Sequence, residues 1–185
     1  MKRKVIAITG GIGAGKSQVA KILQSKGFQT VDCDNLSRQV AQQPQTLAAV
    51  QKLLGAEYVT NGQLNRTLIR QVIFKDSVLL SRYNKIFFDA ILQLLDQIVQ
   101  NSTETLFVEI PLLDAFEYDW YQIWLVTSSS QTRIDRVTAR DNVDAQNVLD
   151  VMSQQKQTEN YTAILHNDGS LQELEQQIDK LLQQL

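Results

Sequence analysis

The chain has 185 residues, of which 43% are hydrophobic and 21% are charged, and its formal net charge is -2. These values predict a soluble globular protein of one domain with an inserted subdomain, and they argue against bulk attraction to nucleic acid or an anionic membrane. The sequence contains no stretch of about 18 apolar residues, so we expect no transmembrane helix. The single Cys33 excludes an internal disulfide, and the opening residues enter a strand without a cleavable apolar signal, so we expect a cytoplasmic location.

Short apolar runs alternate with helical patterns along the chain. The runs that predict strands are residues 5–9, 30–33, 105–110, 123–127 and 163–166. Between the second and third runs, residues 35–103 contain several helical patterns, including a long one at 81–100, and no convincing strand. This alternation predicts an α/β protein with a parallel sheet and crossover helices, in which residues 35–103 form an inserted substrate-binding subdomain.

The segment from Gly10 to Ser17 reads GGIGAGKS and directly follows the first predicted strand. It matches the pattern GxxxxGKS, in which glycines allow backbone N–H groups to turn toward phosphates. Lys16 adds a mobile positive charge, and the hydroxyl of Ser17 suits Mg²⁺, which prefers oxygen ligands. An amphipathic helix beginning near Lys16 completes the context, so the segment predicts a phosphate-binding loop rather than a chance glycine-rich turn.

Two aspartates follow the second predicted strand, at the sheet edge where parallel strands bind ligands. If the chain stays extended there, Asp32 and Asp34 point to one side and Cys33 to the other. Such a carboxylate could deprotonate or orient an acceptor hydroxyl and help to organise Mg²⁺ through water. The alternative is that Asp34 only caps the following helix.

A third acidic residue, Glu109, ends the predicted strand at 105–110. Its place beside a phosphate loop is typical of a carboxylate that helps to hold Mg²⁺. A strand end that faces the surface is an equally good interpretation of Glu109.

Three arginines recur at helical spacing: Arg133, Arg136 and Arg140 lie three and four residues apart. They can therefore project from one side of a helix, which suits a lid whose arginines close over phosphates. The alternative is a solvated basic face paired with Asp135 and Asp141.

The C-terminal segment predicts one more amphipathic helix. Ser170 and Glu173 form a capping-box pattern at its start. The apolar stripe expected to pack on the sheet is Leu171, Leu174, Ile178, Leu181 and Leu185. The single histidine, His166, and Cys33 are interpreted as structural residues, because neither has a partner nearby in the sequence for catalysis or metal binding.

Taken in order, these motifs resemble the dephospho-CoA kinase family over nearly the whole chain. ITGGIGAGKS is similar to the family's opening, DCDNLSR to its DADxxAR element, and residues 61–74, NGQLNRTLIRQVIF, to its DGxLxRxxLRxxIF segment. Residues 110–113 resemble its PLL element, and Arg136 with Arg140 and Asp141 resembles its R(x)₃RD lid. Gln155 resembles the family's helical glutamine, and the ending HNDGSLQELEQQI resembles its DNxGSxxEL tail.

The resemblance implies a P-loop nucleoside-triphosphate hydrolase-like fold with three layers and a five-stranded parallel sheet with helices on both faces. It implies a single kinase domain over residues 1–185, with a helical acceptor-binding insertion at about 35–103 and a lid at about 130–158. The implied reaction uses ATP and Mg²⁺ to phosphorylate the ribose 3′-hydroxyl of dephospho-CoA, giving coenzyme A and ADP in the last step of CoA biosynthesis. We expect ATP and dephospho-CoA as partners, no nucleic acid or membrane, and a monomer or weak homo-oligomer.

The family's functional residues carry over to matching positions of this sequence. Asp34 is implied as the catalytic base, with Lys16 and Arg140 acting on the phosphates, although Asp32 stays open as the alternative base. Asp32 and Arg38 are implied on the acceptor side. Ser17 is the implied Mg²⁺ ligand, with Asp32 or Glu109 acting through water. The implied ATP-binding residues are Gly11, Ile12, Gly13, Ala14, Gly15, Lys16 and Ser17.

Several positions depart from the family pattern. Phe88 and Asp89 replace a His-Pro pair, and Ala115 replaces a glutamate. Arg133 stands where a glutamine is usual, and His166 replaces an aspartate, but no departure falls in the phosphate loop. Two alternatives therefore stay open: another small-molecule, nucleoside or nucleotide P-loop kinase, and a divergent nucleotide-binding protein that has lost phosphoryl transfer.

Overall fold

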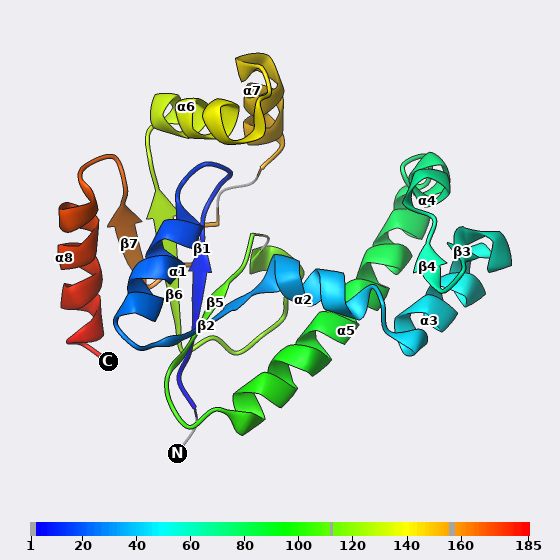
Figure 1. Ribbon diagram of the computed structural model, residues 1–185, viewed down its shortest axis with the longest axis horizontal. Coiled ribbons are helices and arrows are strands. Elements are labelled where there is room, and N and C mark those ends of the chain that lie inside the picture. The colour runs from blue at the N-terminus through cyan, green and yellow to red at the C-terminus, as the bar shows by residue number, and fades with distance from the viewer. Residues whose placement is uncertain (1–2, 112, 156–157) are drawn as a thin grey trace. The chain divides into compact units, whose positions relative to one another are not determined.

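The structure is a computed structural model that describes residues 3–111, 113–155 and 158–185. Figure 1 shows the helices and strands. In chain order they are β1 (Val5–Thr9), α1 (Lys16–Ser25), β2 (Gln29–Asp32), α2 (Cys33–Val40), α3 (Pro44–Leu54), β3 (Val59–Thr60), β4 (Gln63–Leu64), α4 (Arg66–Ile73), α5 (Ser77–Asn101), β5 (Leu106–Glu109), β6 (Gln122–Thr127), α6 (Ser130–Asp141), α7 (Ala145–Gln154), β7 (Ala163–His166) and α8 (Leu171–Leu182).

The main sheet has five strands in the order β2-β5-β1-β6-β7, and every neighbouring pair is parallel. Every residue of β1 is buried, as expected for a central strand that is covered on both faces. The predicted α/β fold with a five-stranded parallel sheet is confirmed. The strands predicted at 5–9 and 163–166 match β1 and β7, and the other three differ by one residue at one or both ends.

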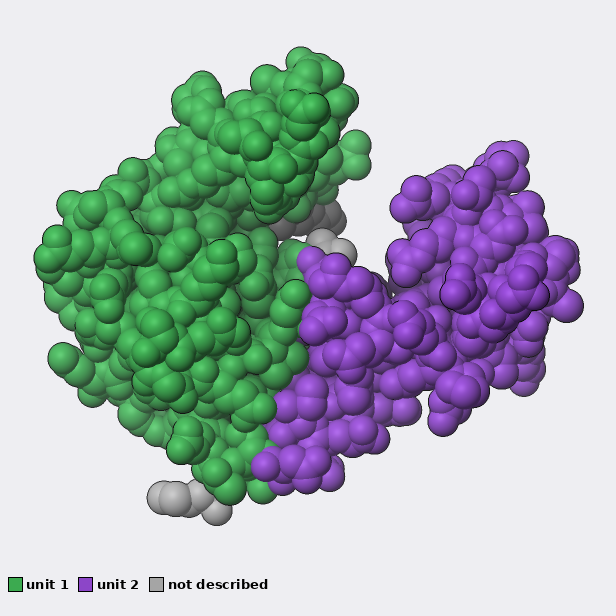
Figure 2. All heavy atoms as spheres, in the orientation of Figure 1, with its two compact units in different colours: residues 1–32, 102–185 green, residues 33–101 purple. Residues whose placement is uncertain are grey.

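The chain divides into two compact units, coloured separately in Figure 2. Unit 1 consists of residues 1–32 and 102–185, and it contains the whole main sheet. Unit 2 is Cys33–Asn101. No helix in the described part of the chain combines the length and the apolar character that crossing a membrane requires.

The core of unit 1 lies between the sheet and helices α1 and α8, which contact each other in Figure 1. Phe107 of β5 and Trp124 of β6 form its aromatic centre, with ring centroids 5.1 Å apart. From α8, Leu174 and Ile178 are fully buried, and the predicted capping box between Ser170 and Glu173 is present. The prediction that Leu171 belongs to the packed apolar stripe is wrong, because this residue, at the first position of α8, is 57% exposed.

Unit 2 is mainly helical and has its own small core. In one buried cluster, Val50, Ile69 and Ile73 pack together, and aromatic side chains of the 25-residue helix α5 pack around them. The expectation of no strand in this region is wrong, because β3 and β4 form an antiparallel hairpin. Each strand has only two residues, too few to produce a period-two pattern. Asn61 and Gly62 form the turn that joins them, with φ values of 53° and 71°.

Candidate active site

The phosphate loop connects the carboxyl end of the central strand β1 to helix α1. Gly13 and Gly15 have φ values of 75° and 100°, in the left-handed region that favours glycine. At Gly15 a Cβ atom would also lie 2.0 Å from Nδ2 of Asn167. The loop therefore needs glycine here both for its backbone conformation and for the close approach of another segment. Helix α1 begins at Lys16, as predicted.

The side chain of Lys16 folds back over this loop. Its Nζ donates hydrogen bonds to the carbonyl oxygens of Gly10, at 2.8 Å, and Gly11, at 3.4 Å. Ser17 is exposed in the first turn of α1. The positive end of the helix, the ammonium group and the hydroxyl group thus meet at one end of α1, which is the set of groups that a nucleotide phosphate requires.

A cavity of about 270 Å³, here called the phosphate-side cavity, lies beside the loop in unit 1. Its lining residues are Gly13, Gly15, Lys16, Ser17, Gln18, Glu109, Arg136, Val137, Arg140 and Asn167. The structure thus brings Lys16, Ser17, Glu109 and Arg140 to one cavity from three places in the sequence. Positive side chains and oxygen ligands suit a nucleotide phosphate with its metal ion.

The oxygen groups in this cavity fit Mg²⁺, provided that phosphate or water completes the coordination. Ser17 offers a hydroxyl, and the half-buried Glu109 offers a carboxylate. In the part of the chain that the structure describes, no group of three His, Cys, Asp or Glu side chains could hold a metal ion by itself. This arrangement agrees with the usual coordination of Mg²⁺, which keeps several waters and binds substrate phosphates with few protein ligands.

Asp32 lies beside Glu109 at the carboxyl edge of the sheet, since the two residues are register partners in the β2–β5 pair. The expected extended path from Asp32 to Asp34 is wrong, because α2 begins at Cys33. Cys33, Leu36 and Val40 are its buried residues, at a helical spacing that starts immediately after the strand.

Asp34 therefore lies inside the first turn of α2 rather than at a capping position before it. Arg38 lies four residues further along the same helix, so both residues are on one helix face. Both side chains are exposed and both belong to unit 2. Cys33 is buried, as expected for a structural cysteine.

Two of the three predicted lid arginines bind the backbone of the phosphate loop. Arg133 Nε donates to the carbonyl oxygen of Ile12 at 2.8 Å. Arg136 Nη1 donates to the carbonyl oxygens of Gly13, at 3.5 Å, and Ala14, at 3.4 Å. The interpretation of a solvated basic face is therefore wrong for these two arginines. Asp135, which was a predicted ion-pair partner, instead accepts a hydrogen bond from the Gln131 side chain.

Arg140 is the exposed member of the row. Its guanidinium binds both carboxylate oxygens of the neighbouring Asp141, at 2.7 and 2.6 Å. This contact raises the pKa of Arg140 and lowers that of Asp141. The solvated ion pair expected in the alternative interpretation is thus present here, while Arg140 also lines the phosphate-side cavity.

Two buried polar residues of the site escaped the sequence analysis. Ser128 and Asn167, 8% and 7% exposed, both bind the carbonyl oxygen of Ala14, through Oγ at 3.2 Å and Nδ2 at 2.9 Å. Arg136 joins them, because its guanidinium donates to Ser128 Oγ and to the Asn167 carbonyl oxygen. Each follows the carboxyl end of a strand, β6 or β7, so the rule that drew attention to Asp32 could have identified them.

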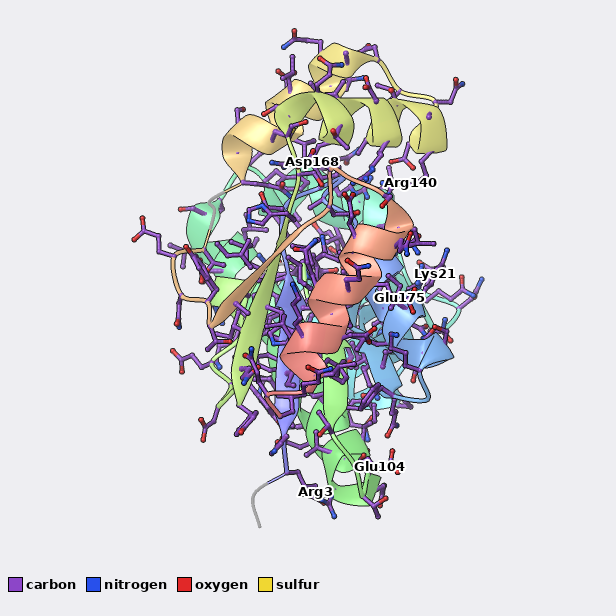
Figure 3. The ribbon with its side chains drawn as sticks, turned by 90° about the vertical axis from the view of Figure 1, so that its left-hand side faces the viewer. Arg3, Lys21, Glu104, Arg140, Asp168 and Glu175 are labelled. Atoms are coloured by element: carbon purple, nitrogen blue, oxygen red, sulfur yellow. The ribbon has the colours of Figure 1, made fainter. Side chains whose placement is uncertain are left out.

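Asp168, the next residue, fixes the start of the lid helix α6. Its carboxylate accepts a hydrogen bond from the Ser129 N–H at 2.7 Å. This bond is the main reason that the pKa of Asp168 is lowered, and the side chain of Thr132 contributes next. Figure 3 labels Asp168 in the loop after β7 and Arg140 on α6.

A second cavity of about 540 Å³, here called the lid cavity, lies on another side of the phosphate loop in unit 1. Gly10 and Gly11 line it from the loop, and Arg133 and Gln155 line it from the lid. Its remaining lining residues are Thr9, Ala14, Pro111, Leu113, Asp114, Leu125, Val126, Thr127, Ser128, Val151, Met152, Gln154 and Thr158. Of the predicted PLL element, Pro111 and Leu113 thus lie at this cavity, and Leu112 is outside the described residues.

A parallel sheet whose central strand runs into a GxxxxGKS loop, with the lysine folded over that loop, defines a P-loop kinase fold. The solved shikimate kinase from Acinetobacter baumannii shares this fold, with a TM-score of 0.55 and 14% identity over 98% of this chain and 94% of that one.

Sequence comparison identifies the particular family. The profile of the Dephospho-CoA kinase family matches residues 4–173. A dephospho-CoA kinase from Hydrogenovibrio crunogenus is 30% identical, over 97% of this chain and 96% of its own. A solved structure from Thermus thermophilus superposes with a TM-score of 0.85 at 29% identity, covering 100% of this chain and 99% of that one.

The chain therefore belongs to the dephospho-CoA kinase family, which carries out the last step of coenzyme A biosynthesis, and it is a kinase. This is the family that the motifs predicted. The finding favours it over another small-molecule P-loop kinase and over a nucleotide-binding protein without transfer activity.

Proposed function

We propose that the chain transfers the γ-phosphoryl group of Mg²⁺-bound ATP to the ribose 3′-hydroxyl of dephospho-CoA, and that donor and acceptor meet at the phosphate loop. The observation that carries this proposal is the pair of cavities on the loop. Gly13, Gly15 and Lys16 line the phosphate-side cavity, whereas Gly10 and Gly11 line the lid cavity.

On the donor side, the backbone N–H groups of the loop and the first turn of α1 hold the ATP phosphates. Lys16 and Arg140 neutralise charge on the transferring group, which is the main catalytic task in phosphoryl transfer. Ser17 and Glu109 hold Mg²⁺, directly or through water, and Asp32 supports them from the neighbouring strand. When bound, Mg²⁺ supplies charge neutralisation and orientation of the phosphates.

On the acceptor side, the lid cavity has both apolar and polar walls, from residues such as Leu125, Met152, Asp114 and Thr127. Its volume is within the usual range for a small-molecule site. Such a lining suits an acceptor with alternating apolar and polar groups. Dephospho-CoA has this character, with its amide-containing arm and its pyrophosphate.

For the proton of the 3′-hydroxyl we assign the general base to Asp34, with Arg38 orienting the acceptor from the same helix face. Asp34 follows two residues after Asp32, whose register partner is Glu109 of the phosphate-side cavity. Asp32 is the alternative base.

Three variants test these roles in an assay that couples ADP release to dephospho-CoA phosphorylation. Lys16→Ala should abolish measurable turnover because it removes charge stabilisation of the transition state. Asp34→Asn should cut turnover about 10²-fold or more while a fluorescent ATP analogue still binds. Asp32→Asn should lower turnover by a smaller factor than Asp34→Asn.

A matched control is Asp150→Asn on the exposed surface of α7, where the carboxylate accepts a hydrogen bond from the Gln146 side chain. Its turnover should equal that of the unaltered protein. Full turnover in Asp34→Asn together with a large loss in Asp32→Asn would transfer the base to Asp32. The cytoplasmic location and the monomeric or weakly oligomeric state stay predictions.

A further inference from the structure

Two side chains at opposite ends of the lid hold both backbone groups of one residue in the phosphate loop. Gln155, which follows α7, accepts a hydrogen bond from the N–H of Ile12 through Oε1 at 2.9 Å. Arg133, in the first half of α6, donates from Nε to the carbonyl oxygen of Ile12 at 2.8 Å. The Arg133 Nη2 also lies 3.5 Å from the same Gln155 oxygen. The three residues therefore form a closed set, here called the Ile12 clamp.

The clamp depends on the absence of a side chain at Gly11. A Cβ atom there would lie 2.3 Å from Arg133 Nη2 and 3.2 Å from Gln155 Oε1. Gly13 and Gly15 have positive φ values, but Gly11 does not, so its backbone conformation is open to other residues. Space for the clamp, and not the loop's backbone conformation, is what requires glycine at position 11.

The Arg133 guanidinium binds a backbone carbonyl group, although its partial burial disfavours the charged form. The half-buried guanidinium has a lowered pKa because burial removes water from the charged form. It donates hydrogen bonds to the Ile12 carbonyl oxygen and to the neutral Gln155 amide. A charged donor that is partly desolvated and holds neutral oxygen atoms acts here by fixing geometry.

We propose that Arg133 and Gln155 are positioning residues for phosphoryl transfer, acting through the backbone of Ile12 rather than on either substrate. Ile12 lies between the loop residues that line the lid cavity and those that line the phosphate-side cavity. Fixing its two peptide groups sets the direction in which the loop presents its N–H groups. The conformation of the phosphate loop therefore depends on the position of the lid.

The inference rests on the proposed kinase function, and its test separates the two. The first variant, Gly11→Ala, should lower kcat about 10²-fold while the KM values for ATP and dephospho-CoA change less than about threefold, because geometry rather than binding is lost. In an Arg133→Ala background the same Gly11→Ala change should lower kcat less than about threefold further, because the group that the new methyl meets is gone.

A second pair of variants keeps the proposal testable if Gly11→Ala does not fold, as judged by circular dichroism and urea unfolding. Gln155→Ala removes the acceptor for the Ile12 N–H and should lower kcat, whereas Gln155→Glu keeps an oxygen there and should restore most of it. Gln146→Ala is the matched control on the lid surface, since that side chain contacts Asp150 and is remote from the loop in sequence and in hydrogen bonding.

The proposal is overturned if Gly11→Ala is equally costly with and without Arg133, or if the losses in the Arg133 and Gln155 variants reside in KM. The latter result would make these residues substrate ligands. An unaltered protein that forms no coenzyme A would instead overturn the proposed function, before any variant is compared.

Discussion

At the scale of single residues, the three lid arginines have different environments despite their regular spacing. Arg136 donates to four oxygen atoms of the loop and of the segments after β6 and β7. Arg140 is exposed and pairs with Asp141. The spacing predicted that the arginines share one helix, but only the fold brings the Ala14 and Asn167 carbonyl oxygens to Arg136. We infer that Arg136 is structural and Arg140 is catalytic.

The variants Arg136→Ala and Arg140→Ala should therefore differ in what they lose. Arg136→Ala removes hydrogen bonds from a half-buried charged donor to acceptors on the buried residues Ser128 and Asn167, and it should lower the free energy of unfolding by about 1.5–3 kcal/mol. Arg140→Ala removes one exposed ion pair, which is worth about 1 kcal/mol or less, but should reduce turnover about 10²-fold. Urea unfolding and steady-state kinetics measure the two effects. Equal stability loss in both variants would contradict this division of roles.

At the scale of elements, the lid helix α6 is attached to the loop before α8 through Asp168. The Ser129 side chain accepts from the Thr132 N–H as a helix cap, and the Ser129 N–H itself donates to Asp168. Asp168 thus connects the segment after β7 to the residue that caps α6 (Figure 3). The sequence predicted the capping box of α8 as a local signal, but not this bond, whose partners are 39 positions apart.

The contact of Asp168 predicts a dependence of stability on pH. Since folding lowers the pKa of this carboxyl, its contribution to stability is present above the unfolded value, about 3.9, and is lost as pH falls through the lower folded value. Asp168→Asn should be less stable than the unaltered protein at pH 7, and the difference should shrink toward pH 3. Urea midpoints across this range test it. A constant difference at all pH values would show that the charge of Asp168 contributes nothing.

The limits of element prediction are clearest at α2. The sequence predicted a strand to Cys33 and an extended path to Asp34, whereas the helix begins at Cys33 itself. A four-residue strand joined directly to a helix leaves no turn residues to mark the boundary. The longer signals identified their helices, because the periodic run of α5 and the motif before α1 each extend over many residues, although α5 begins at Ser77 rather than at the predicted residue 81.

At the scale of the whole molecule, each compact unit has a cluster of buried hydrophobic residues among the residues that the structure describes. The core of unit 1 supports the phosphate loop from beneath, since it contains residues of β1, α1 and the buried Ala14 of the loop itself. Alternation of strands and helices predicted the sheet. The loop contacts of Ser128, Asn167 and Gln155 were not predictable, because each joins segments more than 100 positions apart.

The core of unit 1 can be probed from α8. Ile178 is fully buried, so Ile178→Ala should lower the free energy of unfolding by about 2–5 kcal/mol. Leu171→Ala on the same helix is the control and should change it by less than about 0.5 kcal/mol, since Leu171 is 57% exposed. Chemical denaturation measures both. Similar losses in the two variants would contradict the packing of α8 on the sheet through Ile178.

The most direct test of the proposed function is the identification of the product formed from ATP, Mg²⁺ and dephospho-CoA. Mass spectrometry and phosphorus NMR should show one 3′-phosphorylated coenzyme A for each ADP released. The 3′-deoxy analogue of dephospho-CoA should give neither product, and chelation of Mg²⁺ should stop the reaction. ATP binding without formation of coenzyme A, or a phosphate at another position of the acceptor, would contradict phosphoryl transfer from ATP to the 3′-hydroxyl.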